Sequence, residues 1–316
     1  MFSAHAVLSS PETFLTRPLT AGKSGAIVAL ADDSTDSPGG IVLKYVRRDT
    51  GSAELWSSSV REAQFYTAVM QNPAEYPYAP EILDTEITDM ALCTVMRRYR
   101  PLTTDTTALS PALFDRICGA LAAVHASPIP ESFLPLSDRA EPPYLTDAVC
   151  AECAAGWETV LAEHLGAFSR EDRALPAVLA ADINGVIARH FVPPAHFVHG
   201  DFHIGNLLWD THGDIRICDW QSCGIGDSAG DLAFFISRLS ADGFAPDTDD
   251  LIHRYCSAVG QCSAVMSPAP EEIRNRMRLS SALTAFRFWH QYLHGAPAER
   301  VEGIFRAMAE DFAHLL

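Results

Sequence analysis

The apolar residues of this 316-residue chain change their spacing near residue 101, and this change limits its possible folds more than any other feature. Before it, short β-branched runs such as Ile41–Val46 predict strands. After it, apolar residues recur at helical spacing over three turns or more. Both the order of these two patterns and the chain length suit an α/β (α+β) molecule of two lobes. We expect the N-terminal lobe to span 1–100 and a helical C-terminal lobe to span 101–316.

The first lobe is expected to be a small antiparallel sheet that carries one helix. Its strands are predicted at 26–30, 41–46, 82–87 and 92–96, and its helix at 54–70. Helices of the second lobe are predicted at 111–126, 146–165, 175–191, 232–239, 248–259, 271–293 and 298–316. A β-rich interruption between Phe197 and Asp219 breaks this pattern, and its strands 207–209 and 215–218 predict a hairpin that turns around Gly213.

Polar residues stand at both ends of this predicted hairpin. Asp201 and Asn206 precede its first strand and Asp219 follows its second, so the three side chains are expected to converge. Carboxylate and carboxamide oxygens suit Mg²⁺ when the ion also binds nucleotide phosphates. A carboxylate beside such an ion can orient a hydroxyl group and accept its proton. The pattern therefore indicates phosphoryl transfer, although Asp and Asn are also common in turns and helix caps.

Two linked motifs resemble a known superfamily. The sequence H-G-D-x-x-x-x-N at 199–206, followed by D-W at 219–220, resembles the aminoglycoside phosphotransferases and choline kinases, which are distant relatives of protein kinases. The segment G-I-G-D-S-A-G-D-L-A at 224–233 is similar to their G-D-P-x-x-D-L-A. The resemblance runs from about residue 19 to 239 and is specific over 199–233. It implies a bilobal protein-kinase-like fold, with nucleotide bound by the N-lobe and catalysis and substrate binding in the C-lobe.

The resemblance also implies roles for the residues of the first motif. Asp201 would be the catalytic carboxylate, and Asn206 and Asp219 would bind Mg²⁺. His199 would support the loop through a hydrogen bond, and His203 would lie near the phosphates or the substrate. From the residues alone, a zinc site built on the two histidines and Asp201 remains an alternative, although no fourth ligand is evident.

Lys44 stands among apolar neighbours on a predicted strand, where an isolated lysine can also face solvent. The resemblance assigns it to the α- and β-phosphates, with Glu62 as the helix carboxylate that holds it. Glu54 on the same helix competes for that role. The resemblance also places Ser24 and Gly25 in a hairpin that covers the phosphates.

The segment 92–99 falls where the resembling kinases place the hinge that binds the base. Met96 and Arg98 are therefore expected to contact the nucleotide. Many relatives carry an acidic or neutral residue near this point, and the pair Arg97 and Arg98 departs from that pattern. The choice between ATP and GTP remains open.

Other residues of the second lobe are expected to be structural. His125 would be buried at a helix end, Asp231 would cap the helix that follows it, and Asp227 would lie in a loop. The spacing of four aromatic residues near the C-terminus predicts core positions, with contact to the acceptor as the alternative: Phe286, Phe288, Trp289 and Tyr292.

The charge and composition of the chain limit the classes of binding partner and the cellular compartment that we expect. The chain has 40 acidic and 23 basic residues, and its net charge of −17 disfavours nucleic acid and anionic membranes. The sequence shows no signal peptide and no apolar run long enough to span a membrane, so we expect a cytoplasmic protein. The eight cysteines, including the C-x-x-C of Cys150 and Cys153, are expected to be reduced thiols, because no second pair stands at zinc-site spacing.

The sequence thus predicts a small-molecule kinase that uses ATP or GTP and Mg²⁺ to phosphorylate a hydroxyl group. The first candidate acceptor is an antibiotic, such as an aminoglycoside or another sugar-containing natural product. The second is a metabolite such as choline, a sugar or an amino alcohol. A nucleotide-binding pseudokinase is the alternative from a different class. The sequence does not specify an oligomeric state.

Overall fold

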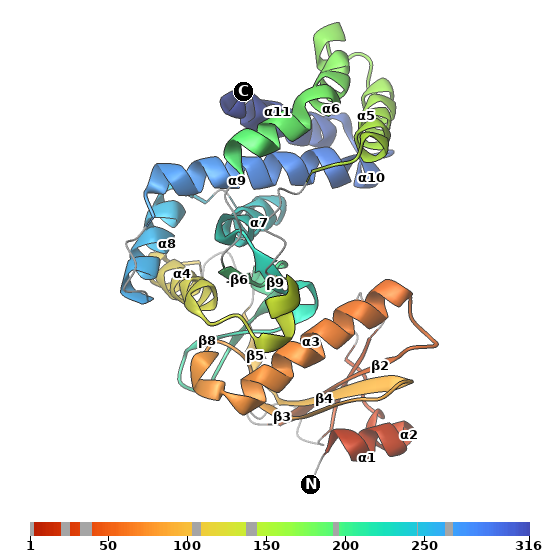
Figure 1. The fold of residues 1–316 in the computed structure, drawn as a ribbon, viewed down its shortest axis with the longest axis vertical. Coiled ribbons are helices and arrows are strands. Elements are labelled where there is room, and N and C mark those ends of the chain that lie inside the picture. Colours follow the sequence, from red (N-terminus) through yellow and green to blue (C-terminus); the bar gives the residue numbers. More distant parts are fainter. Residues whose placement is uncertain are drawn as a thin grey trace.

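The computed structural model describes residues 3–19, 26–31, 40–102, 109–136, 144–191, 196–244, 246–262 and 268–316. The chain forms a small lobe built around a sheet, drawn at the bottom of Figure 1, and a larger helical lobe above it. The fold class predicted from the sequence is therefore confirmed.

The small lobe contains a four-stranded antiparallel sheet with the strand order β1-β2-β4-β3. Its strands are β1 (Ile27–Leu30), β2 (Ile41–Arg47), β3 (Ile82–Ile87) and β4 (Ala91–Arg97). Helix α3 (Ala53–Gln71) covers one face of the sheet, and α1 (Ala4–Ser9) and α2 (Pro11–Phe14) lie on the other side (Figure 1). Ser52 is the N-cap of α3, and its side chain accepts a hydrogen bond from the Leu55 N–H at 3.0 Å.

The large lobe is mainly helical. Its helices are α4 (Pro111–Ala126), α5 (Asp147–Ala162), α6 (Arg170–His190), α7 (Ser228–Ala241), α8 (Thr248–Cys262), α9 (Pro270–Thr284), α10 (His290–Tyr292) and α11 (Ala298–Leu315). Its short strands form the sheet β5 (Arg100–Pro101), β7 (Leu207–Trp209) and β8 (Ile215–Ile217), and the pair β6 (His196–Val198) and β9 (Gly224–Gly226). Helices α5, α6 and α11 lie farthest from the small lobe (Figure 1).

One hydrophobic core joins the two lobes. Phe65 of α3 lies against Trp220, with their ring centroids 4.2 Å apart, and Trp220 stacks on Phe197 at 5.8 Å. All three side chains are fully buried. A second core lies among α5, α6, α9 and α11. The joint core therefore fixes α3 against the β-rich segment of the large lobe.

Most predicted elements are present, and some of the differences lie at helix ends. Helix α6 begins at Arg170, where Ser169 and Asp172 form a capping box. Helix α7 begins at Ser228, and Asp227 rather than Asp231 caps it. The prediction that Asp231 caps this helix is therefore wrong.

The C-terminal helix predicted at 271–293 contains a π-helical segment, η6 (Ala285–Trp289), between α9 and α10. Helices α1 and α2 and the pair β6–β9 had not been predicted. Among the described helices, none has both the length and the apolar character needed to cross a membrane.

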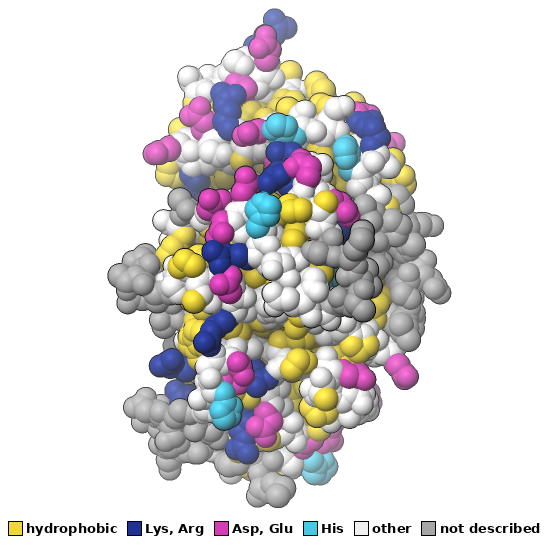
Figure 2. All heavy atoms as spheres, turned by 90° about the vertical axis from the view of Figure 1, so that its left-hand side faces the viewer, with side chains coloured by type: hydrophobic (Ala, Val, Ile, Leu, Met, Phe, Trp, Pro, Cys, Tyr) yellow, Lys and Arg dark blue, Asp and Glu magenta, His cyan; other side chains and the backbone are white. Residues whose placement is uncertain are grey.

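The surface shows how the acidic excess is distributed on one side of the molecule. On the face drawn in Figure 2, basic and acidic side chains are interspersed. Acidic and basic side chains also form ion pairs, such as that between Arg254 and Asp250 at 2.7 Å. The net negative charge is not gathered into one patch on this face.

Candidate active site

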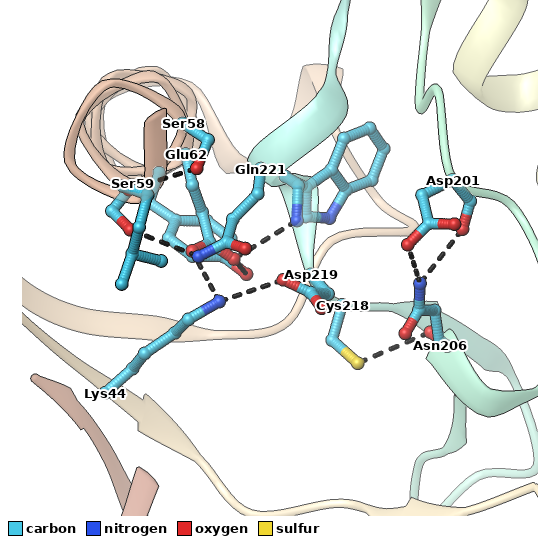
Figure 3. A network of polar contacts seen from close by, with 12 residues as sticks. Lys44, Ser58, Ser59, Glu62, Asp201, Asn206, Cys218, Asp219 and Gln221 are labelled. Carbon is cyan, nitrogen blue, oxygen red and sulfur yellow. Dashed lines mark hydrogen bonds and ion pairs between the residues drawn. The ribbon is translucent and has the colours of Figure 1, made fainter. Parts of the chain in front are cut away.

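The structure brings Lys44, Glu62 and Asp219 together at the junction of the lobes (Figure 3). The Nζ atom of Lys44 on β2 lies 2.7 Å from Oε2 of Glu62 on α3 and 2.9 Å from Oδ1 of Asp219, which follows β8. Lys44 and Glu62 are buried, whereas Glu54 is exposed. Burial alone would lower the pKa of Lys44, but the two carboxylates raise it above its ordinary value, so the ammonium group stays charged.

The two carboxylate oxygens of Glu62 have different partners. Oε2 binds Lys44, while Oε1 accepts hydrogen bonds from the Tyr66 hydroxyl and from the backbone N–H of Trp220, both at 3.1 Å. Glu62 is 3% exposed, so these contacts compensate for the loss of water around its charge. One buried carboxylate therefore holds both the lysine and the residue that follows Asp219.

Asp201 and Asn206 lie on the other side of the site (Figure 3). Asn206 Nδ2 donates to the Asp201 backbone oxygen at 2.9 Å and to its Oδ2 atom at 3.4 Å. Both contacts use the amide nitrogen. The Oδ1 atom of Asn206 can therefore serve as a ligand to another group. Burial raises the pKa of Asp201, and the neighbouring His203 and His199 oppose this rise.

His199 is fully buried, and both of its ring nitrogens are used within the chain. Nε2 lies 3.0 Å from the Cys218 carbonyl oxygen, and Nδ1 accepts from the Asp201 N–H at 3.2 Å. The ring therefore carries its hydrogen on Nε2 and holds the loop around Asp201. With both nitrogens engaged, His199 is unsuited to a zinc site, and no group of three or more His, Cys, Asp or Glu side chains in the described ranges could hold a metal ion.

His203 lies beside the Asp201 carboxylate. Its Nδ1 atom accepts from the Gly205 N–H at 3.1 Å, and its Nε2 atom lies 3.8 Å from Asp201 Oδ2. Burial lowers the pKa of His203, while the charge of Asp201 acts against this shift. The structure thus places His203 next to the predicted catalytic group.

Asp231 supports the same loop from helix α7. Its carboxylate accepts from the N–H groups of His199 and Gly200, both at 2.8 Å, and lies 3.2 Å from Nε2 of His125. His125 is buried, as predicted. Gly200 has a φ of 79°, and a Cβ atom there would lie 2.3 Å from the Ser222 carbonyl oxygen, so only glycine fits without strain.

Asp219 has an unusual backbone conformation. Among the described residues, it is the only non-glycine residue with a positive φ, at 62°. Such a conformation is costly and persists when the surrounding structure fixes it, which occurs most often at functional sites. The Asp219 carboxylate contacts Lys44 in this conformation, and its side chain remains 39% exposed.

The donor atoms present fit a Mg²⁺ ion that is shared with a nucleotide. Asp219 contributes a carboxylate and Asn206 a carboxamide oxygen. Mg²⁺ is usually bound by one or two protein carboxylates, with phosphates and water completing its shell. Two protein donors are therefore sufficient for this type of site.

The other predicted nucleotide-binding residues and the C-terminal aromatic residues lie apart from these contacts or outside the described residues. Ser24 and Gly25 lie outside the described residues. Met96 is 8% exposed and belongs to the joint core, and the Arg98 N–H donates to the Gly40 carbonyl at 2.7 Å, so it is already engaged. Of the C-terminal aromatic residues, Phe286 is fully buried, whereas Phe288 and Tyr292 are 44% and 71% exposed, so the core prediction is wrong for the latter two.

Sequence reasoning missed several supporting residues. Tyr66 binds Glu62, and Ser59 and Arg61 of α3 contact Gln221 just after Asp219. No local pattern marks Ser59 or Gln221, because serine and glutamine are common at exposed helix and turn positions. Trp220 was visible as the second residue of the D-W motif, but its packing was not.

Comparison with known proteins agrees with this geometry. The profile of the phosphotransferase enzyme family matches residues 26–274. No curated protein matches the sequence. Three similar solved structures are an ADP-bound aminoglycoside phosphotransferase (16% identity, 97% of this chain and 98% of that chain, TM-score 0.58), amicoumacin kinase with AMP-PNP and Ca²⁺ (11%, 97% and 92%, 0.59), and a choline/ethanolamine kinase family protein from Mesorhizobium loti (17%, 98% and 92%, 0.52).

At these identities the structural likeness shows the bilobal kinase-like fold, and the family match adds the class of enzyme. The match covers well over half of the sequence. The chain therefore belongs to the phosphotransferase enzyme family.

Proposed function

We propose that the protein transfers the γ-phosphate of ATP or GTP, in the presence of Mg²⁺, to a hydroxyl group of a small molecule. The observation that carries this proposal is the joint placement of Lys44 between Glu62 and Asp219 and of Asn206 against Asp201 (Figure 3). These groups match the needs of phosphoryl transfer, which depends on positioning and charge neutralisation. Solved structures of similar fold contain ADP or AMP-PNP.

Each group has a distinct role in the proposed reaction. Asp201 orients the acceptor hydroxyl and takes its proton, which requires the ionised carboxylate. Lys44, kept charged by its two carboxylate partners, binds phosphate oxygens of the nucleotide. Asn206 and Asp219 would hold Mg²⁺, which when bound would neutralise charge on the phosphates. His199 keeps the Asp201 loop in place through its two ring nitrogens.

The first acceptor candidate is an antibiotic, such as an aminoglycoside or another sugar-containing natural product. Several solved structures of similar fold are phosphotransferases of such compounds, among them spectinomycin and macrolide phosphotransferases. The second candidate is choline, a sugar or an amino alcohol, and a choline/ethanolamine kinase family protein also has a similar fold. The acidic excess of the chain would favour a cationic acceptor in either case.

We also infer that the protein acts in the cytoplasm. All eight cysteines have free thiols, and seven of them are at least partly buried. Free thiols are typical of reducing compartments, which also hold ATP and GTP.

The test is nucleotide consumption by the purified protein with Mg²⁺, ATP or GTP, and a library of hydroxyl-bearing antibiotics and metabolites. The expected result is consumption that depends on one acceptor class and is lost in Asp201→Asn. Growth of bacteria on an antibiotic panel, with and without the expressed gene, separates the two acceptor candidates. Protection from no compound would count against the antibiotic candidate.

The pseudokinase alternative predicts a different outcome. Such a protein would bind nucleotide but show no consumption with any acceptor. The contact of Lys44 with Asp219 and that of Asn206 with Asp201 favour the active enzyme, because pseudokinases have no need to keep these pairs in place.

A further inference from the structure

The segment after Asp219 is tied to helix α3 by side chains that the proposed reaction does not use. Gln221 Nε2 donates to Ser59 Oγ at 3.1 Å, and Arg61 Nη1 donates to the Gln221 carbonyl oxygen at 3.2 Å. Figure 3 shows Ser59 and Gln221 facing each other beside Glu62. Ser59 is 1% exposed, so its hydroxyl depends on partners within the chain.

These contacts act on a backbone that needs external support. Asp219 lies in the left-handed region, and the two residues after it are the ones that α3 holds. On the other side of Asp219, the Cys218 N–H donates to the Asn206 carbonyl at 2.9 Å. Asp219 is therefore fixed from the large lobe before it and from helix α3 of the small lobe after it.

We propose that Ser59 and Gln221 are positioning residues for Asp219, which set the place of its carboxylate through the hydrogen bond between their side chains. This inference rests on the proposed role of Asp219 in binding Mg²⁺ with the nucleotide. Helix α3 thereby performs two tasks: Glu62 holds Lys44, and Ser59 holds the segment that carries Asp219. The first task is independent of Mg²⁺, whereas the second controls how well the site binds the ion.

The chain offers a matched control beside Ser59. Ser58 is the preceding residue of α3, and its hydroxyl donates to the Leu55 carbonyl of the same helix at 3.0 Å. Ser58→Ala therefore removes an identical group from the same helix without touching Gln221. Gln221→Met removes the amide group with little change in length, and Gln221 is only partly buried, so this variant should fold even if Ser59→Ala does not.

The experiment measures ADP or GDP binding by calorimetry over a range of Mg²⁺ concentrations in the parent protein, Ser59→Ala, Gln221→Met, the double variant and Ser58→Ala. We expect the Mg²⁺ concentration for half-maximal binding to rise about threefold to tenfold in each single variant, the range for one neutral hydrogen bond. The double variant should resemble the single variants, because all three lack the same bond. Binding without Mg²⁺ should stay within about twofold of the parent.

A second readout needs no ligand. Hydrogen exchange in the segment 219–222 of the nucleotide-free protein should be faster in Ser59→Ala and Gln221→Met and unchanged in Ser58→Ala. An unchanged Mg²⁺ requirement in both single variants would overturn the inference. Equal weakening with and without Mg²⁺ would also overturn it, since it would show a general effect on the nucleotide pocket. A parent protein that binds neither nucleotide would instead contradict the proposed function on which the inference rests.

Discussion

The Nζ atom of Lys44 lies 2.9 Å from Oδ1 of Asp219, although 175 positions separate the two residues in the sequence. This ion pair connects the sheet of the small lobe to the end of the hairpin in the large lobe. With Glu62 as its second partner, Lys44 forms a three-residue charge group in which Lys44 and Glu62 are buried. The arrangement of the site therefore depends on the correct folding of both lobes.

The first prediction concerns the stability of this charge group. Lys44→Met leaves the buried Glu62 without its cation, and removal of one partner of a buried ion pair costs about 3–5 kcal/mol of unfolding free energy. Lys44→Met combined with Glu62→Gln removes both charges and should recover at least half of that loss. Urea unfolding of the three proteins measures the difference. A double variant less stable than Lys44→Met would contradict this account.

The second prediction separates the two carboxylates of the site. Asn tolerates the left-handed conformation of residue 219, so Asp219→Asn should fold like the parent. Loss of its charge should weaken Mg²⁺-dependent nucleotide binding by about tenfold or more, that is by at least 1.4 kcal/mol. Asp201→Asn should leave binding within about twofold of the parent and lower turnover by about 10²- to 10⁴-fold. Calorimetry and steady-state kinetics on both variants test this separation, and near-normal turnover in Asp201→Asn would disprove the role of that carboxylate.

The third prediction concerns the loop that carries Asp201. Gly200→Ala forces a side chain into contact with the Ser222 carbonyl at a positive φ, which should cost about 1–3 kcal/mol of stability and lower turnover. Gly224 on the neighbouring strand β9 has no atom within 4 Å of an added Cβ atom. Gly224→Ala is therefore the matched control and should change the melting temperature little. Equal effects of the two substitutions would show that Gly200 has no special requirement.

The fourth prediction concerns pH. Burial alone would raise the pKa of Asp231, but its hydrogen bond and charge interaction with His125, with further contributions from His199, hold the pKa below its ordinary value. A carboxyl group whose pKa is lower in the folded state stabilises that state above the unfolded pKa of about 3.9, and this contribution is lost as the pH falls through the folded pKa.

Asp231→Asn should therefore lower the free energy of unfolding by about 3–5 kcal/mol at pH 7, because it disrupts a buried charged network. The difference between variant and parent should stay constant from about pH 7 to 5 and shrink below about pH 4. Urea unfolding over this range gives the comparison. If the difference in unfolding free energy grew as the pH fell, the pKa of Asp231 would not be lowered in the folded state.

The elements that the sequence predicted best are those with a clear local period or a fixed motif. The strands of the small lobe follow from β-branched runs, and the convergence of Asp201, Asn206 and Asp219 follows from the hairpin between them. The contact of Ser59 with Gln221 joins side chains 162 positions apart, and neither residue type signals a partner.

Helix caps show a second limit. Asp227 and Asp231 stand in one short segment and both suit a helix start, so the sequence does not distinguish them. The structure distinguishes them by their contacts. The buried Asp231 carboxylate accepts from the His199 N–H, whereas the Asp227 carboxylate accepts from the first turn of α7 and from Arg276. Strands β6 and β9 have three residues each, too few to show a period of two.

The continuous core has a consequence for how such proteins can be recombined. Phe65 and Tyr66 belong to the first hundred residues, yet they pack in one cluster with Phe197 and Trp220. A chimera that joins the first hundred residues of a relative to the remainder of this chain would mismatch the two halves of that cluster. Productive exchange at this point should therefore require that the aromatic residues contributed by the two parts match each other.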